Sequence, residues 1–114
     1  MAIQTSTRVV DDVAIVDITG QLRYPEATGI LREVVQALVR DLYRKILLNL
    51  AGVIHIDSAG IGELMSNLTT VRNQGGELKV MNPNKNVRNL LQITRLFTVL
   101  DVHEDEASAL KAFQ

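Results

Sequence analysis

The 114-residue sequence predicts an α/β fold, in which a single mixed, mostly parallel sheet with an antiparallel opening strand is covered by about four helices. Short β-branched or apolar runs alternate with segments whose apolar residues recur at three- and four-residue spacing. Such alternation requires crossover connections and therefore parallel strands. Only Asp11-Asp12 separates the first two strands, which is too short for a crossover, so that pair must be antiparallel.

The first elements follow from this pattern in chain order. Residues 8–10 and the β-branched run at residues 13–18 predict the opening hairpin, Gly20 ends its second strand, and residues 21–24 form a loop. Pro25 is expected to begin the first helix, because the N–H that proline lacks has no partner in a first helical turn. The apolar stripe of this helix is predicted to comprise Ala27, Ile30, Leu31, Val34, Val35, Leu38 and Leu42.

The remaining chain predicts three strands and three helices in alternation. Residues 46–50 are an apolar run typical of a strand buried on both faces, and residues 54–57 lead from it into the second helix, which Gly75-Gly76 ends. Residues 78–81 and 99–102 predict the last two strands. The buried sides of the three helices are expected to comprise Ile61, Leu64, Met65, Leu68 and Val71, then Val87, Leu90, Leu91 and Thr94, then Leu110 and Phe113.

Composition and charge indicate one cytoplasmic domain over residues 1–114. The chain has no cysteine, which excludes disulfides and thiolate metal sites and fits a reducing compartment. Its 12 basic and 13 acidic residues show no basic excess of the kind that nucleic-acid binding requires. No apolar run approaches the roughly 20 residues of a membrane span. His55 and His103 share no short spacing, so we expect no metal site. We likewise expect no cofactor, no nucleic acid and no membrane span.

The segment Asp57-Ser58-Ala59-Gly60-Ile61-Gly62 carries the chemistry of the chain. It stands where a strand meets a helix, and Ser58 is placed at the N-cap position, where its hydroxyl could accept a backbone N–H. Two glycines in one helical turn are unusual, since each lowers helix stability by about 1 kcal/mol relative to alanine. Their absent side chains would let another molecule approach the start of the helix closely.

Three interpretations of this segment remain open. Ser58 could be only a helix cap, as serine commonly is. Gly60 and Gly62 could open a dinucleotide site with Glu77 downstream, although Met65 stands where a third glycine is expected and Asp57 would face the pyrophosphate. Ser58 could instead be a phosphoacceptor, because the N–H groups of a helix N-terminus favour a phosphate. In that case close to two extra negative charges would appear on a bare contact surface.

The segment from Asp57 to Leu64 resembles the phosphorylation-site signature of STAS domains of the anti-sigma-factor antagonist type. The resemblance extends over nearly the whole chain, through Gly20-x-Leu22, the helix from Pro25, residues 46–50 and Gly75-Gly76. It implies a STAS-like fold and a non-catalytic, partner-switching role. The partner-binding residues that it implies are Arg23, Tyr24, Asp57, Ser58, Ala59, Gly60, Ile61 and Gly62.

The same resemblance implies the partners. The unmodified antagonist would bind an anti-sigma factor that is also a serine kinase, phosphorylation of Ser58 would release it, and a serine phosphatase would restore it. Two alternatives stay open: a STAS module with another protein partner, such as a stress-sensing scaffold or the cytoplasmic subunit of a transporter, or a small nucleotide-binding domain. The oligomeric state is left undetermined.

Arg23 departs from the family pattern, in which many members carry an aspartate at this place in the loop after Gly20-x-Leu22. A base therefore replaces an acid beside the expected phosphorylation site. A guanidinium could pair with a phosphate on Ser58, or it could point into solvent or meet an acid on the partner.

Overall fold

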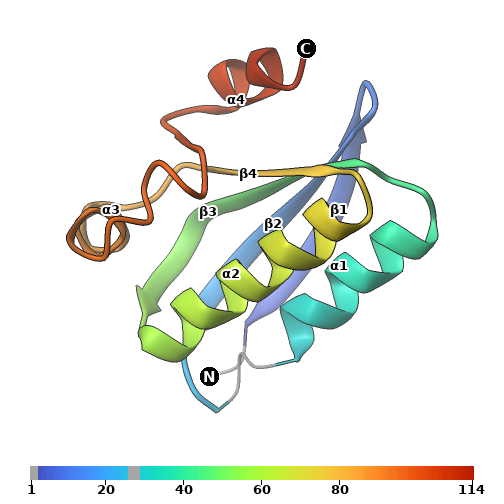
Figure 1. The fold of residues 1–114 in the computed structure, drawn as a ribbon. Helices are drawn as coiled ribbons and strands as arrows, with labels where there is room; N and C mark the ends of the chain where they lie inside the picture. Colours follow the sequence, from blue (N-terminus) through green and yellow to red (C-terminus); the bar gives the residue numbers. More distant parts are fainter. Residues whose placement is uncertain (1–2, 26–28) are drawn as a thin grey trace.

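The computed structural model describes residues 3–25 and 29–114, and its elements follow the predicted order β-β-α-β-α-β-α-β-α (Figure 1). The strands are β1 (Gln4–Val10), β2 (Val13–Leu22), β3 (Lys45–Ile56), β4 (Glu77–Met81) and β5 (Val102–His103). The helices are α1 (Ile30–Arg40), α2 (Ser58–Asn73), α3 (Lys85–Ile93) and α4 (Glu106–Ala112).

Within the described residues the strands form one mixed sheet in the order β1-β2-β3-β4-β5. The strands β1 and β2 are antiparallel across the Asp11-Asp12 turn, and the pairs β2/β3, β3/β4 and β4/β5 are parallel. The predicted mixed, mostly parallel sheet with an antiparallel opening strand is therefore confirmed. Because the parallel strands run in one direction, the carboxyl ends of β2 and β3 meet at the same edge of the sheet.

Helices cover both faces of this sheet. The helices α1, α2 and α3 contribute to the larger core, and α1 and α2 run side by side across that face (Figure 1). The helix α4 lies against the opposite face, where Ala109 and Phe113 pack with Ile15 and Leu47. Successive strand residues point to opposite faces, so β2 supplies both cores, Val16 to one and Ile15 to the other. The two-sided burial explains the continuous apolar runs of the central strands.

The first helix starts later than the sequence predicted. Pro25 lies in a turn and α1 begins at Ile30. The backbone N–H of Tyr24 donates to Oδ2 of Asp57, 33 residues later in the chain. This bond holds the residues around Tyr24 against the start of α2, so α1 begins further along the chain. Of the predicted stripe, Leu31, Val35 and Leu38 are buried, whereas Ala27 lies outside the described residues.

Four strands also differ in extent from the prediction. The strand β1 begins at Gln4 instead of residue 8, because its pairing with β2 starts with Gln4 opposite Thr19. The strand β2 continues through Gly20 to Leu22, because irregular pairing with β3 extends as far as Leu22 opposite Ile56. For the same reason β3 runs past residue 50 to Ile56. The last strand is shorter than expected, since residues 99–101 form turns and only Val102–His103 pairs with β4.

Three helices end in the same hydrogen-bonded motif, known as the Schellman motif. After α2, the N–H groups of Gly75 and Gly76 donate back to Arg72 and Val71, each at 3.0 Å, and Gly75 has a φ of 79°. The same two bonds close α1 and α3, with Leu42 (φ 72°) and Arg95 (φ 62°) in the left-handed position. Leu42, which was predicted to be in the apolar stripe of α1, is consequently 74% exposed.

Replacing Leu42 by glycine is expected to raise the free energy of unfolding by up to about 1 kcal/mol. A left-handed φ costs a residue with a Cβ about 1–2 kcal/mol, whereas glycine costs roughly 0.5–1 kcal/mol in chain entropy. Gly75→Ala, at the equivalent position of α2, should lower the free energy of unfolding by a similar amount. The control Leu42→Ala retains the Cβ and should stay within about 0.5 kcal/mol of wild type. Urea unfolding measures all three, and a Leu42→Gly variant no more stable than wild type would contradict the assignment of strain.

Candidate functional site

The candidate site lies where β3 ends and α2 begins, at the carboxyl edge of the sheet. The helix N-cap is Asp57, which has extended backbone angles (φ −117°, ψ −174°), and its Oδ1 accepts the N–H of Gly60 at 2.9 Å. The expectation that Ser58 is the N-cap is therefore wrong. Because β3 runs on to Ile56, the last non-helical residue is Asp57, and Ser58 is the first residue of the helix.

Asp57 also binds the loop that follows β2. Its Oδ2 accepts the N–H of Tyr24 at 3.1 Å, and the N–H of Asp57 points at the carbonyl of Leu22 at 3.4 Å. One carboxylate thus joins the loop to the start of α2. The Gly60 N–H, followed by the N–H groups of Tyr24 and Ala59 and the charge of Arg23, keeps the pKa of Asp57 below its usual value against the opposing effect of burial.

The two glycines of the first helical turn have different roles. A Cβ on Gly60 would lie 2.1 Å from the carbonyl oxygen of Leu22 and 2.7 Å from Ile56 Cγ1, so its missing side chain permits internal packing of α2 on the end of β2. The expectation that Gly60 leaves room for another molecule is wrong, because this room is filled by the chain itself. Gly62 is exposed, and a Cβ there would meet nothing within 4 Å.

The structure brings all the predicted site residues together at one end of the molecule, with differing exposure. Arg23, Tyr24, Ser58 and Gly62 are exposed, Asp57 and Ala59 are half-buried, and Gly60 and Ile61 are buried. The side chains that a partner could contact are therefore those of the loop and of Ser58. Tyr24 is 71% exposed, which leaves most of an aromatic ring uncovered beside the first turn of α2.

Ile54 is a surface residue of this edge that the sequence analysis missed. It precedes the site by only four residues in the chain and is 57% exposed, whereas its neighbour Val53 is buried. Strand alternation places the two side chains on opposite faces. Residues 54–56 belong to β3 and do not lead into the helix as predicted, since His55 and Ile56 pair with Gln21 and Leu22 of β2.

Glu63 is a second residue that the sequence did not single out. Its side chain is 3% exposed, and Oε1 accepts Arg32 Nη2 at 2.8 Å while Oε2 lies 3.5 Å from the N–H of Gly29. This ion pair ties the first turns of α1 to α2, one helical turn past Ser58. Removing one member would leave the other charge partly desolvated, so we infer that the pair sets how the two helices meet beside the site.

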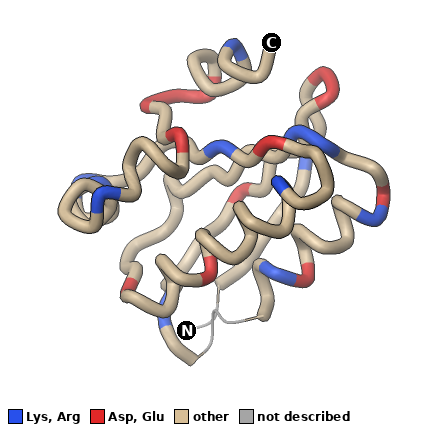
Figure 2. The backbone as a smooth tube through the Cα atoms, viewed as in Figure 1, with Lys and Arg blue, Asp and Glu red and all other residues tan. Residues whose placement is uncertain are grey.

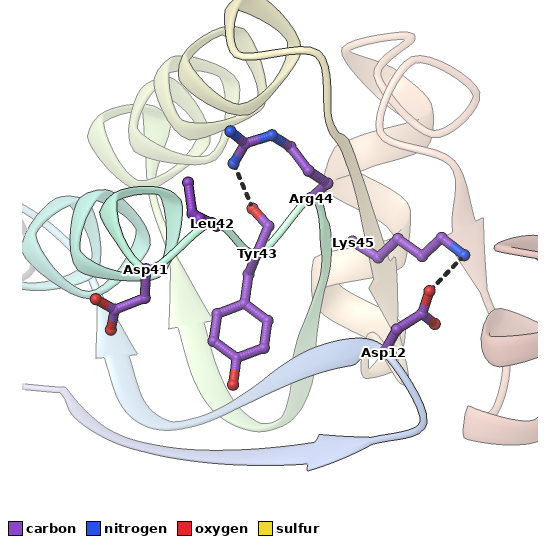
Figure 3. Close-up of a pocket in the computed structure, with 6 residues that line it drawn as sticks. All are labelled: Asp12, Asp41, Leu42, Tyr43, Arg44 and Lys45. Atoms are coloured by element: carbon purple, nitrogen blue, oxygen red, sulfur yellow. Dashed lines mark hydrogen bonds and ion pairs between the residues drawn. The ribbon is translucent and has the colours of Figure 1, made fainter.

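Other candidate sites lie elsewhere or are not supported. A cavity of about 320 Å³ is lined by Asp12 and residues 41–45, and the Lys45–Asp12 ion pair (2.9 Å) closes one side of it (Figure 3). It opens at the amino end of β3, opposite to Ser58. Among residues 3–25 and 29–114, acidic and histidine side chains form no three-residue cluster suited to a metal ion. Basic and acidic residues are interspersed along the described backbone (Figure 2).

Comparison with known proteins gives a consistent family. Residues 4–109 match the STAS domain family. The chain is 28% identical over 98 residues to a protein of Paenibacillus polymyxa named anti-sigma F factor antagonist, an alignment that covers 86% of this chain and 84% of that relative. No helix within the described residues has the length and apolar character needed to cross a bilayer.

Solved structures share the fold. The crystal structure of TM1081 from Thermotoga maritima superposes with a TM-score of 0.87 at 26% identity and covers 96% of this chain and 93% of its own. The Bacillus cell-fate determinant SpoIIAA in its phosphorylated form superposes with a TM-score of 0.71 at 18% identity over 99% of this chain and 100% of its own. The second likeness concerns the fold alone.

Gly60→Ala is expected to lower the free energy of unfolding by about 1–3 kcal/mol, because the added methyl group must displace the Leu22 carbonyl or the helix. Gly62→Ala is the matched control in the same turn. It meets open space and should raise the free energy of unfolding by up to about 1 kcal/mol through helix propensity. Thermal and urea unfolding compare the two variants, and equal stabilities would contradict the internal role of Gly60.

Proposed function

This chain belongs to the STAS domain family, and from that premise we propose that residues 1–114 act as an anti-sigma factor antagonist in the cytoplasm. In its unmodified form it binds an anti-sigma factor that is also a serine kinase. Phosphorylation of Ser58 releases it, and a serine phosphatase restores the binding form. The chain itself is a regulatory, non-catalytic component of this cycle. The name of the Paenibacillus polymyxa relative supports the proposal.

The observation that carries the proposal is the exposed position of Ser58 at the first residue of α2. Asp57 already accepts the Gly60 N–H as the cap, so the fold of the helix does not depend on the Ser58 hydroxyl. No described side chain hydrogen-bonds to that hydroxyl, and Ser58 is solvent-accessible. A kinase can therefore reach it, and its modification need not unfold the helix start.

The surroundings of Ser58 explain why a phosphate would act as a switch. The exposed ring of Tyr24 provides apolar contact surface beside the first turn of α2. A phosphate adds about 1.5 to 2 negative charges beside the carboxylate of Asp57, whose lowered pKa keeps it ionised at neutral pH. Desolvating that charge against an apolar or acidic partner surface would oppose association.

Ser58 is expected to be the phosphoacceptor of the cognate serine kinase. Incubation with the kinase and ATP, followed by mass spectrometry, should show one phosphate on wild type and none on Ser58→Ala. Ser66→Ala, which changes another exposed serine of α2, is the control and should be labelled like wild type. Calorimetry should show that phosphorylated wild type and Ser58→Asp bind the kinase at least about tenfold more weakly than the unmodified chain. Full labelling of Ser58→Ala would overturn the assignment.

Arg23 is expected to stabilise the phosphorylated form. The charge of Arg23 is the smallest of the influences that lower the pKa of Asp57, and the hydrogen bond from its guanidinium to Gln21 Oε1 is long at 3.4 Å. The guanidinium is therefore available to a phosphate on the neighbouring Ser58. Because Arg23 is exposed, the gain should be no more than about 1 kcal/mol.

The test compares phosphorylated and unmodified thermal midpoints for wild type, Arg23→Gln and Arg23→Asp. The rise on phosphorylation should be largest for wild type and smallest for Arg23→Asp, and one phosphatase should act most slowly on wild type. Equal shifts and equal dephosphorylation rates in all three proteins would show that Arg23 does not contact the phosphate.

A further inference from the structure

The outer edge of β1 offers a second interaction surface, remote in sequence from the Ser58 site. The strand is the first of the sheet and pairs with β2 on one side only (Figure 1). Within the described residues no backbone group pairs with its other side. An unpaired strand edge presents a row of free N–H and C=O groups that another strand can complete.

The hairpin register shows which residues face outward. Val10 and Val13 close the two-residue turn at Asp11-Asp12, and a pair in that position must exchange both of its backbone hydrogen bonds. Because bonded and non-bonded pairs alternate, Arg8, Ser6 and Gln4 bond to β2. The backbone groups of Thr5, Thr7 and Val9 consequently point away from the sheet.

This edge lacks the usual features that discourage strand pairing. The strand QTSTRVV contains no proline or lysine, and its register with β2 has no bulge. Its one charged residue, Arg8, is already neutralised by Asp17 (2.8 Å) and Glu106 (2.6 Å). Val9 is 49% exposed, which leaves an apolar side chain uncovered on the strand.

We propose that β1 pairs antiparallel with β1 of a second copy of this chain, around a two-fold axis through Thr7. The outward-facing set is symmetric about Thr7, so this register pairs Thr7 with Thr7 and Thr5 with Val9 of the other copy, and every outward backbone group finds a partner. Thr–Thr and β-branched pairs favour such a ladder. Arg8 lies opposite Ser6 of the other copy, so no like charges meet.

A second copy completes this edge without a shift of register, because the outward groups of β1 are arranged symmetrically about Thr7. The result is a continuous sheet across two protomers. None of the predicted partner-binding residues belongs to β1, so each protomer of the dimer keeps its Ser58 site. The inference is independent of the proposed function.

Sedimentation velocity of the full chain, from micromolar to millimolar concentration, tests the proposal. Wild type should form a dimer as concentration rises. Thr7→Pro removes an outward N–H that the protomer does not use, and Thr7→Lys places two like charges across the axis. Each variant should weaken dimerisation at least tenfold while circular dichroism stays that of wild type. Thr98→Lys, at an exposed loop residue, is the control and should dimerise normally.

The two variants at position 7 distinguish a loss of dimerisation from a loss of folding. If Thr7→Pro fails to fold, Thr7→Lys still tests the edge, and added salt should partly restore its dimer. A wild type that stays monomeric at millimolar concentration would overturn the proposal. So would a dimer that forms equally well with lysine at position 7, since its contact must then lie elsewhere.

Discussion

The carboxylate of Asp57 connects the parts of the chain on which the candidate site depends. It caps α2 through the Gly60 N–H and binds the loop after β2 through the Tyr24 N–H. The close approach of Gly60 to the Leu22 carbonyl brings the helix near enough for both bonds. Because Asp57 supplies the cap, the cap does not require the Ser58 hydroxyl, and Ser58 is exposed at the surface. The same geometry that stabilises the start of α2 therefore leaves the side chain of Ser58, its first residue, accessible to a modifying enzyme.

The two faces of the sheet are covered by different means. The face with α1, α2 and α3 buries a large apolar core, and the charged pair Arg32–Glu63 lies at its border beside the site. On the other face, the seven-residue α4 buries little beyond Ala109 and Phe113. Arg8 links it to the sheet by bonding both Glu106 and Asp17, and this guanidinium is the chief reason that the pKa of Asp17 is lowered. Partly exposed ion pairs of this kind contribute little each, so α4 depends mainly on the packing of Ala109 and Phe113.

The electrostatic potential around Ser58 is set by nearby residues and not by a large net charge of the chain. The net charge is −1, and basic and acidic residues are mixed along the backbone (Figure 2). A phosphate would therefore change the potential mainly within about one Debye length, roughly 8–10 Å under physiological salt. That distance includes the loop with Arg23 and Tyr24, which Asp57 holds against α2. A single modification can thus alter one contact surface while the core, the sheet and the β1 edge remain unchanged.

Local patterns in the sequence determined the element order, the mixed sheet and the apolar stripe of α2, because periodicity depends only on neighbouring residues and on which face meets apolar surroundings. They also singled out the Asp57-to-Gly62 segment, since two glycines after an Asp-Ser pair are unusual at a helix start. Tertiary structure alone decided that Asp57 caps α2, that Gly60 packs on Leu22, and that α1 begins only at Ile30. The packing of Gly60 and the late start of α1 depend on contacts with Leu22 and Tyr24 that span more than 30 residues, and no local pattern encodes such contacts. The cap bond spans only three residues, but Asp57 becomes the cap because β3 pairs with β2 as far as Ile56. The burial of Glu63 beside Arg32 and the exposure of Ile54 have the same origin, because packing between elements decides which side chains lose contact with water.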